Sequence, residues 1–394
     1  MRRILIFSSI YDNRFMGGAE LAVKEITDRI APDEIEFHMV TLRFDSSLPR
    51  LERVGNVLVH RLGFTGRNPV VGDVRRFPLH YNKYLFPFLG ALFARKLYAR
   101  HRYDAIWSIQ ANYAGFAALF FKIWHSSVPF LLTLQEGDPI EHYKRRVGPL
   151  LFLYRKIFLS ADAIQAISNY LAQIAREMGY HGSLEVVPNG VDVRRFSQPR
   201  REEEIRALKH KLNKKTGDIF LITTSRLEEK NAVGDIISAI TFLPSTFKLL
   251  ILGQGQEELK LKELARRLRV AERVVFLGYV KQTDVPLYLQ ISDIFVRPSR
   301  SEGMGSSFVE AMAAGIPVIA TPVGGIVDFL HDGETGLFCE VGNPKSIAEK
   351  VQEYLQNTEL TEQIVKNAKE MVRRQYDWSV IADAMTKVFR SLAE

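Results

Sequence analysis

The 394-residue chain contains a single cysteine, Cys339, so no internal disulfide can form. A secreted scaffold held together by disulfides is therefore excluded. No apolar run approaches the roughly 18 residues that a membrane-spanning helix needs. The apolar start of the chain soon turns polar and lacks a small-residue cleavage site, so a first buried strand is expected rather than a signal peptide. These features predict a cytoplasmic protein.

Three ligand motifs are also missing from the sequence. It contains no P-loop, no G-x-G-x-x-G and no D-x-D pair of carboxylates. The first two absences leave a dinucleotide cradle unsupported, and the third argues against a metal-bound diphosphate. We therefore expect no bound cofactor and no metal site.

Positive charge is confined to the first half of the chain. The net charge is +8, and residues 1–198 hold 26 Lys and Arg against 18 acids, whereas the remainder holds 27 of each. Residues 67–102 contain eight Lys and Arg, one acid and many aromatic residues. Such a segment is either a helix with a core face and a solvated basic face, or a peripheral contact with an anionic membrane. No motif indicates nucleic-acid binding.

Short apolar segments alternate with helix-length amphipathic segments, which predicts an α/β fold with parallel sheets. We expect one domain over 1–197, joined by a C-terminal helix at 376–394, and a second domain over 198–375. The charged stretch 199–218 marks the neighbourhood of the boundary between them. Strands are predicted at 3–9, 36–42, 57–62, 104–109, 129–135, 162–167, 185–187, 219–225, 248–255, 273–280, 293–299 and 317–322. Two α/β units of similar length predict a ligand in a cleft, at the carboxyl ends of strands.

The stretch SEGMGSSFVEAMAAG, residues 301–315, follows one of these predicted strands. Gly303 and Gly305 bracket Met304 and allow positive φ or a close backbone approach. One of the two serines that follow is predicted to start a helix. Its exposed amides and dipole would favour a bound anion by about 0.3–1 kcal/mol.

Two glutamates of this stretch, Glu302 and Glu310, lie eight positions apart. A local explanation exists for the second. Ser307 and Glu310 have the spacing of a capping box, in which the glutamate accepts a hydrogen bond from the serine amide. That explanation leaves Glu302 and the glycines unexplained, and the spacing alone does not decide.

Other polar residues follow other predicted strands. Arg226 and Lys230 come after 219–225, either as a solvated turn or as cations for a diphosphate leaving group. Gly17 and Gly18 open the first helix with exposed amides. A further group after 129–135 would recognise sugar hydroxyls, accept a proton, or form a solvated turn; its acids are Glu136 and Asp138.

The segments SRLEEKN, FLGYV, VVPNGVD and YDWSVIADAMTKVF, together with the stretch 301–315, resemble family 4 of the retaining glycosyltransferases. The similarity extends over nearly the whole chain. Within the family, the chain resembles the bacterial and archaeal group 1 enzymes of cell-surface glycan or glycolipid synthesis. It implies a GT-B fold, in which two Rossmann-like parallel-sheet domains face a deep cleft. It also implies a nucleotide-diphosphate sugar, UDP- or GDP-linked, as donor.

The resemblance implies a role for each candidate residue. Arg226 and Lys230 would neutralise the diphosphate, Glu302 would contact the transferred sugar, and Glu310 would bind the ribose hydroxyls. The remaining donor-binding positions are Gly17, Gly18, Gly253, Val280, Gly303, Met304, Gly305, Ser306 and Ser307. Gln135, Glu136 and Asp138 would lie on the acceptor and sugar side.

Two departures from the family pattern stand out. Many members carry a histidine at Gln135, and the interval from Arg226 to Lys230 is one residue shorter than in many relatives.

The implied reaction is metal-independent transfer to a hydroxyl of a glycan or lipid-linked acceptor, with retention by same-face attack through an oxocarbenium-like ion pair. The departing phosphate would take the acceptor's proton. Alternatives on the same fold are a nucleotide-sugar epimerase, a phosphorylase or a non-catalytic nucleotide-sugar-binding scaffold. The expected place is the cytoplasm, or the inner membrane face through the basic first domain.

Overall fold

The computed structural model describes residues 1–12, 17–69, 73–138, 145 and 148–392. The chain divides into two compact units. Unit 1 comprises Met1–Asn189 and Trp378–Glu394, and unit 2 comprises Gly190–Asp377. The first boundary comes earlier than the expected 197/198, because α7 (Val193–Ser197) packs on α12 (Ser306–Ala314) of unit 2. The second, at 377/378, lies close to the expected 375/376.

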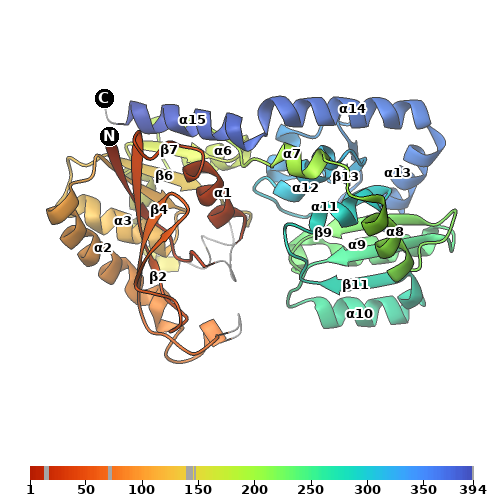
Figure 1. The fold of residues 1–394 in the computed structure, drawn as a ribbon, viewed down its shortest axis with the longest axis horizontal. Coiled ribbons are helices and arrows are strands. Elements are labelled where there is room, and N and C mark those ends of the chain that lie inside the picture. Colours follow the sequence, from red (N-terminus) through yellow and green to blue (C-terminus); the bar gives the residue numbers. More distant parts are fainter. Residues whose placement is uncertain (13–16, 70–72, 139–144, 146–147, 393–394) are drawn as a thin grey trace. The chain divides into compact units, whose positions relative to one another are not determined.

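Unit 1 is built on an eight-stranded sheet (Figure 1). Its strands, in spatial order, are β3 (Leu51–Val54), β4 (Val57–Leu62), β2 (Ile35–Leu42), β1 (Arg2–Phe7), β5 (Ala105–Ile109), β6 (Phe130–Leu134), β7 (Ala163–Ala166) and β8 (Ser183–Val186). All neighbours are parallel except β3, which pairs antiparallel with β4. Sequence patterning did not predict β3, whose residues LERV are charged and at most half-buried.

The helices of unit 1 are α1 (Gly18–Thr27), α2 (Tyr81–His101), α3 (Tyr113–Trp124), α5 (Leu151–Leu159), α6 (Asn169–Glu177) and α15 (Trp378–Ser391). Although α15 comes last in the chain, it lies in the core of unit 1. The Phe389 ring is 5.0 Å from the Trp107 ring and 5.8 Å from the Phe37 ring. Trp378 at the start of α15 is also buried in this cluster. The end of the chain therefore completes the first core.

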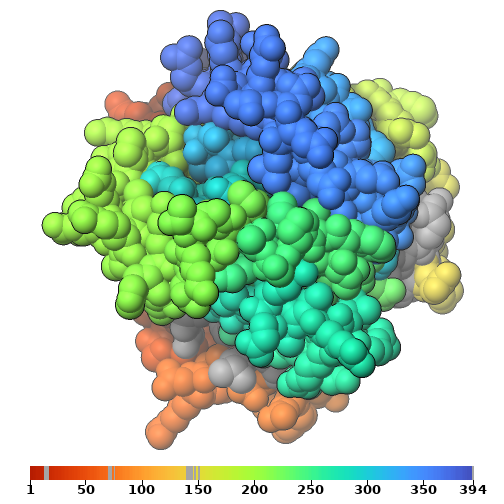
Figure 2. Space-filling view, turned by 90° about the vertical axis from the view of Figure 1, so that its right-hand side faces the viewer, coloured from red at the N-terminus to blue at the C-terminus, as the bar shows by residue number. Residues whose placement is uncertain are grey.

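Unit 2 has a six-stranded, wholly parallel sheet. Its spatial order is β11 (Val274–Gly278), β10 (Phe247–Leu252), β9 (Ile219–Thr224), β12 (Ile294–Arg297), β13 (Val318–Ala320) and β14 (Leu337–Phe338). Besides α7 and α12, its helices are α8 (Glu202–Lys211), α9 (Val233–Ala239), α10 (Glu258–Arg267), α11 (Val285–Gln290), α13 (Pro344–Gln356) and α14 (Thr358–Gln375). In Figure 2 the lime-green α8, the teal α10 and the blue α14 lie at the surface of this unit.

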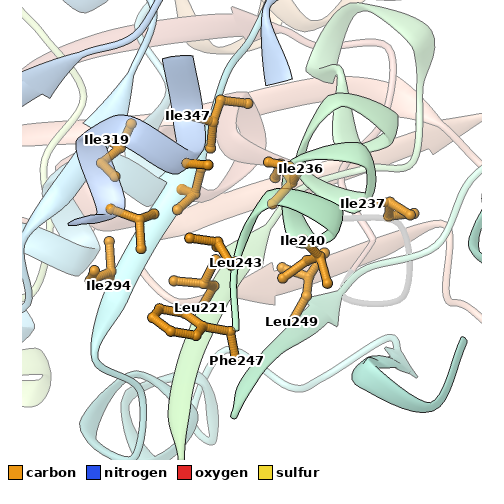
Figure 3. Close-up of a cluster of buried hydrophobic side chains, with 14 of the residues drawn as sticks. Leu221, Ile236, Ile237, Ile240, Leu243, Phe247, Leu249, Ile294, Ile319 and Ile347 are labelled. Carbon is orange, nitrogen blue, oxygen red and sulfur yellow. The ribbon is translucent and has the colours of Figure 1, made fainter. Parts of the chain in front are cut away.

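The core of unit 2 explains why the strands could be found from their composition. Leu221 of β9, Leu249 of β10 and Ile294 of β12 are fully or almost fully buried, and side chains of α9 and α13 cover them (Figure 3). Strands buried on both faces read as continuous apolar runs. The single thiol, Cys339, is buried in the same cluster, and burial raises its pKa to about 12.

A buried histidine pair lies in unit 1, away from the carboxyl ends of its strands. His60 of β4 is 8% exposed, and its ring centroid is 5.7 Å from that of His38 on β2. His38 shares a 2.7 Å hydrogen bond through Nδ1 with the Tyr103 hydroxyl. Burial, together with the charges of neighbouring His38 and His101, lowers the pKa of His60 to about 4. The structure thus favours the neutral imidazole.

This pair predicts an acid-labile unit 1. A histidine whose folded-state pKa lies near 4 contributes its full stability above its ordinary value of 6.5 and loses it as pH falls from 6.5 towards 4. The unfolding midpoint should therefore fall over this range, and His60→Phe should flatten the slope. Thermal unfolding from pH 8 to pH 4 tests this, with exposed His181→Gln as the control. An unchanged slope in His60→Phe contradicts the assignment.

Candidate functional site

In each sheet the strand order reverses beside one strand. In unit 1, β1 lies between β2 and β5, and in unit 2, β9 lies between β10 and β12. In open parallel sheets such reversal points carry ligands at the carboxyl ends of the strands. The segments that follow β9 and β12 hold the cations and glutamates singled out in the sequence, and those that follow β1 and β6 hold the glycines and acids.

Helix α12 begins where the glycines predicted it. Gly305 precedes the helix with φ 85°, and Gly315 follows it with φ 79°. A Cβ at Gly305 would also lie 2.6 Å from the Phe308 ring, so only glycine fits. The helix therefore begins at Ser306 with backbone amides that have no partner within it. This is the geometry expected of an anion site.

The capping-box explanation of Glu310 is wrong. Ser307 Oγ accepts a 2.9 Å hydrogen bond from Arg297 Nη1, and Glu310 Oε1 accepts one of 2.6 Å from Gln282 Nε2. Burial raises the pKa of half-buried Glu310 to about 7, although the Gln282 hydrogen bond and the charges of Arg195 and Arg297 act to lower it. The carboxyl is held by a distant amide side chain and remains separate from the helix cap.

Glu302 is 9% exposed and forms an ion pair with Arg297, the last residue of β12. Its second carboxylate oxygen, Oε1, accepts a 3.1 Å hydrogen bond from the Gly303 amide. The same glutamate's carbonyl oxygen accepts from the Gly325 amide at 3.1 Å. Sequence reasoning missed Arg297, because an arginine inside an apolar strand gives no signal of its partners.

The cation loop after β9 is tied into the same network. Asn231 Nδ2 donates to the Arg226 carbonyl oxygen at 2.6 Å, and Asn231 Oδ1 accepts from Arg297 Nη2 at 2.9 Å. The Arg226 side chain is 71% exposed and pairs with Glu228 at 3.1 Å. Lys230 is half-buried, and its carbonyl oxygen accepts from the Arg300 amide at 2.7 Å. Both cations thus lie on a loop whose backbone is fixed.

Two glycines let neighbouring loops pack closely at this edge. A Cβ at Gly253 would lie 1.8 Å from the Ser225 carbonyl oxygen, and one at Gly255 would lie 2.2 Å from that of Leu227. Gly253, with φ 141°, ends β10 earlier than the predicted 255. The loop after β11 carries half-buried Val280 and the residue that holds Glu310.

Unpartnered polar side chains gather at the same edge. Of the described residues, Thr223 Oγ1, Thr224 Oγ1, Ser225 Oγ and Ser299 Oγ are buried without a hydrogen-bond partner. Polar groups of this kind are unusual in a core and indicate a polar site. The two hollows found on unit 2, of about 470 and 800 Å³, are lined by other residues.

In unit 1, the glycines lie where the sequence placed them. Gly18 starts α1, and the Gly17 amide donates a 2.9 Å hydrogen bond to Glu20 Oε2. Residues 13–16 of the same loop lie outside the described residues. The Gly18 amide remains at the open end of the helix.

Of the two acids after β6, Glu136 is buried and Asp138 is half-buried. Glu136 is 8% exposed; its Oε1 accepts from the Ala111 amide at 2.7 Å and its Oε2 from the Gln135 amide at 2.8 Å. Burial raises the pKa of Glu136 to about 7, with a smaller contribution from the charge of Asp138 and against the effect of the backbone hydrogen bonds. Gln135 Oε1 accepts from Asn189 Nδ2 at 3.1 Å. The geometry makes Glu136 a brace between two loops.

Among the described residues, no group of His, Cys, Asp and Glu has the arrangement of a metal site. Likewise, none of the described helices is long and apolar enough to cross a membrane.

Known protein families match the sequence of both units. The family model described as Glycosyltransferase Family 4 matches residues 16–195, and that of glycosyl transferases group 1 matches residues 204–371. The GDP-mannose-dependent alpha-(1-6)-phosphatidylinositol monomannoside mannosyltransferase of Mycobacterium tuberculosis is 30% identical over 311 residues, 75% of this chain and 78% of that protein.

The chain belongs to the family 4, group 1 glycosyltransferases.

Other matches agree with this placement. The N-acetyl-alpha-D-glucosaminyl L-malate synthase of Bacillus anthracis is 30% identical over 219 residues, about half of each chain: 55% of this one and 56% of that one. HepE of Anabaena, solved in complex with UDP and glucose, superposes with a TM-score of 0.79 at 20% identity, over 99% of this chain and 100% of its own. The two units are thus the Rossmann-like domains of a GT-B glycosyltransferase, a nucleotide-sugar-dependent enzyme of the hexosyltransferase type.

The raised pKa of Glu310 predicts that this carboxyl lowers the stability of unit 2 at neutral and higher pH. A carboxyl whose folded-state pKa is near 7 costs stability as pH rises from 4.5 through 7, because ionisation is then opposed by burial. Glu310→Gln should therefore raise the free energy of unfolding at pH 8, on the order of 1 kcal/mol after allowing for solvent screening, and leave it unchanged at pH 4. Thermal unfolding at the two values decides. Equal shifts at both contradict the titration.

Proposed function

We propose that the protein transfers a hexose, with retention and without a metal, from a UDP- or GDP-sugar to a hydroxyl of a glycan or lipid-linked acceptor. One observation carries the proposal. The open end of α12, both glutamates and the cation loop converge on the carboxyl edge of one sheet, where Arg297 connects Asn231, Glu302 and Ser307. Cations and helix amides are the groups that stabilise a departing diphosphate.

Roles follow from position along this edge. Arg226 and Lys230 would neutralise the diphosphate, together with backbone amides at the start of α12. The Gly17 and Gly303 amides already donate to Glu20 and Glu302. Glu310 would accept hydrogen bonds from ribose hydroxyls, and Glu302 would orient the transferred sugar. Gly253 and Val280, on the neighbouring loops, would border the nucleotide.

The reaction itself would depend on positioning and charge. In same-face attack the bond from the anomeric carbon to the phosphate oxygen breaks, and the acceptor oxygen forms its bond on the same side. The leaving phosphate accepts the acceptor's proton. The cations on the loop after β9 would offset the charge that develops. Gln135, Glu136 and Asp138 would border the acceptor, with Glu136 acting through the loops that it braces.

Support for the donor comes from the similar proteins. The name of the Mycobacterium tuberculosis relative specifies GDP-mannose, and the Anabaena structure contains UDP and glucose. Thermal unfolding with UDP, GDP, ADP and their hexose conjugates would identify the base. A nucleotide at about 100 times its dissociation constant adds roughly 2.7 kcal/mol. Donor consumption without acceptor would indicate an epimerase, and bound pyridoxal phosphate a phosphorylase. Binding without turnover would indicate a scaffold.

Substitution of Arg226 tests the catalytic assignment. We expect Arg226→Ala to lower kcat at least about a hundredfold, by analogy with the loss of a donor that stabilises developing charge. The side chain is 71% exposed, so the fold should survive. Arg266→Ala is a matched control, because Arg266 forms a similarly exposed 3.1 Å ion pair with Glu263 on α10. Wild-type turnover in Arg226→Ala would falsify the assignment.

We further propose that unit 1 contacts an anionic membrane surface, where a lipid-linked acceptor would lie. Helix α2 is apolar on two faces. One face packs in the unit through Phe86, Ala91 and Leu97, but the other is exposed and carries Tyr81, Tyr84, Leu85, Phe88, Leu89 and Leu92. From composition alone, this segment is either a helix with a solvated basic face or a membrane contact. The apolar composition of the exposed face favours the second.

Basic side chains accompany this exposed face, which we call the α2 face. Lys83 Nζ is 4.8 Å from the Tyr84 ring centroid, and Arg95 Cζ is 5.8 Å from that of Trp124 at the end of α3. Trp124 is 45% exposed. Aromatic rings with adjacent cations suit the boundary between acyl chains and anionic headgroups.

Vesicle flotation tests the α2 face. Wild-type protein should float with vesicles of phosphatidylcholine and phosphatidylglycerol, more weakly at high salt, and Phe88→Glu/Leu89→Glu should remain in solution. Leu259→Glu, at an exposed leucine on α10, is the control. Retained flotation in the double variant contradicts the proposal. The proposal is also contradicted if the wild type is a dimer and the double variant is a monomer, because the α2 face would then be an interface between two copies of the chain.

A further inference from the structure

The guanidinium of Arg297 is the point at which three separate segments of unit 2 meet. Arg297 ends β12 and is 9% exposed. Its Nη2 donates to Asn231 Oδ1 at 2.9 Å and pairs with Glu302 Oε2, while Nη1 donates to Ser307 Oγ at 2.9 Å. The Arg297 Cζ lies 5.3 Å from the Phe308 ring centroid. One side chain therefore fixes the loop after β9, the loop after β12 and the first turn of α12.

The contacts continue to the cations. Asn231, held by Arg297 through its oxygen, donates its amide hydrogen to the Arg226 carbonyl oxygen at 2.6 Å. Moving the Arg297 guanidinium would therefore disturb both the carboxylate proposed for the sugar and the loop proposed for the diphosphate. By contrast, Glu310 is held by Gln282.

We propose that Arg297 is a positioning residue for sugar transfer, which holds Glu302 and the Arg226 loop in one arrangement so that the sugar and the diphosphate are engaged together. The proposal rests on the proposed function, and it adds Arg297 to the residues expected from the sequence. The chemistry suits the task. Only arginine presents a planar fork with donors for several acceptors at once, and its charge keeps a buried carboxylate paired.

The test separates binding of the nucleotide from use of the sugar. Arg297→Met should lower kcat/KM at least about tenfold, mainly through kcat, while the dissociation constant for UDP or GDP alone changes less than about threefold. Arg297→Lys should recover part of kcat, because its charge can still pair with Glu302. Calorimetry gives the dissociation constant for the nucleotide, and initial-rate kinetics give kcat and KM. The donor is UDP-glucose or GDP-mannose, according to the base that the wild type binds.

A double-mutant cycle identifies the partner. If Arg297 acts through Glu302, the combined Arg297→Met/Glu302→Gln variant should lose far less activity than the product of the two single losses. Lys214→Met is the matched control. Its ammonium also pairs with an acid of unit 2, Asp293 at 2.6 Å, but this pair lies at the opposite end of β12 from Arg297, so little change in activity is expected.

Three outcomes overturn the proposal: wild-type kcat/KM in Arg297→Met, losses that simply multiply in the double variant, or a lowered unfolding midpoint with normal activity per folded molecule. Failure of the proposed function looks different. In that case the wild type binds neither nucleotide series nor transfers sugar. The double-mutant cycle would then show coupling between Arg297 and Glu302 only in the free energy of unfolding, as expected of a purely structural ion pair.

Discussion

The carboxyl edge of the unit 2 sheet, the proposed donor site, depends on a buried charge. Arg297 and Glu302 leave water together, at 9% exposure each, and the arginine gains Asn231 and Ser307 as further partners. A buried ion pair seldom adds much net stability, yet removing one partner typically costs about 3–5 kcal/mol, because the other charge is stranded. The pair is therefore better understood as a device for specificity of arrangement. Any other loop geometry would separate the two charges and leave each buried without its partner, which costs free energy.

That charge lies at the edge of a mostly apolar sheet. Most side chains of β9, β10 and β12 are buried in the core, and apart from Arg297 and the threonines of β9 the polar groups of the site follow the strands. This division made the fold readable. Apolar runs predicted every strand except β3 and β14, one charged and one only two residues long. It also made the positions of Arg226, Glu302 and the glycines predictable, because parallel strands deliver their following loops to a common edge.

What the sequence could not supply was the partner of each group. Gln282 holds Glu310 from 28 positions away, and Asn231 meets Arg297 across 66. Local rules even misled, since Ser307 and Glu310 have the spacing of a capping box but each bonds to a distant side chain. For Glu136, position after a strand marked the acid as a candidate, but the backbone amides of two loops that its oxygens accept could not be read from the sequence. Spacing identifies candidates, and only tertiary contacts distinguish a brace from a ligand group.

Helix α2 shows the same limit on a surface. Its buried and exposed faces are both apolar, so the periodicity that normally marks a core face is absent, and composition alone allowed two interpretations. The structure shows which residues form each face. The buried face uses small residues and Phe86, whereas the exposed one uses Tyr84, Phe88 and Leu92. Small residues let a helix pack closely on its neighbours, and large amphipathic rings suit a boundary between water and lipid. Burial within unit 1 accounts for only one of the two apolar faces, and the membrane contact proposed above would account for the other.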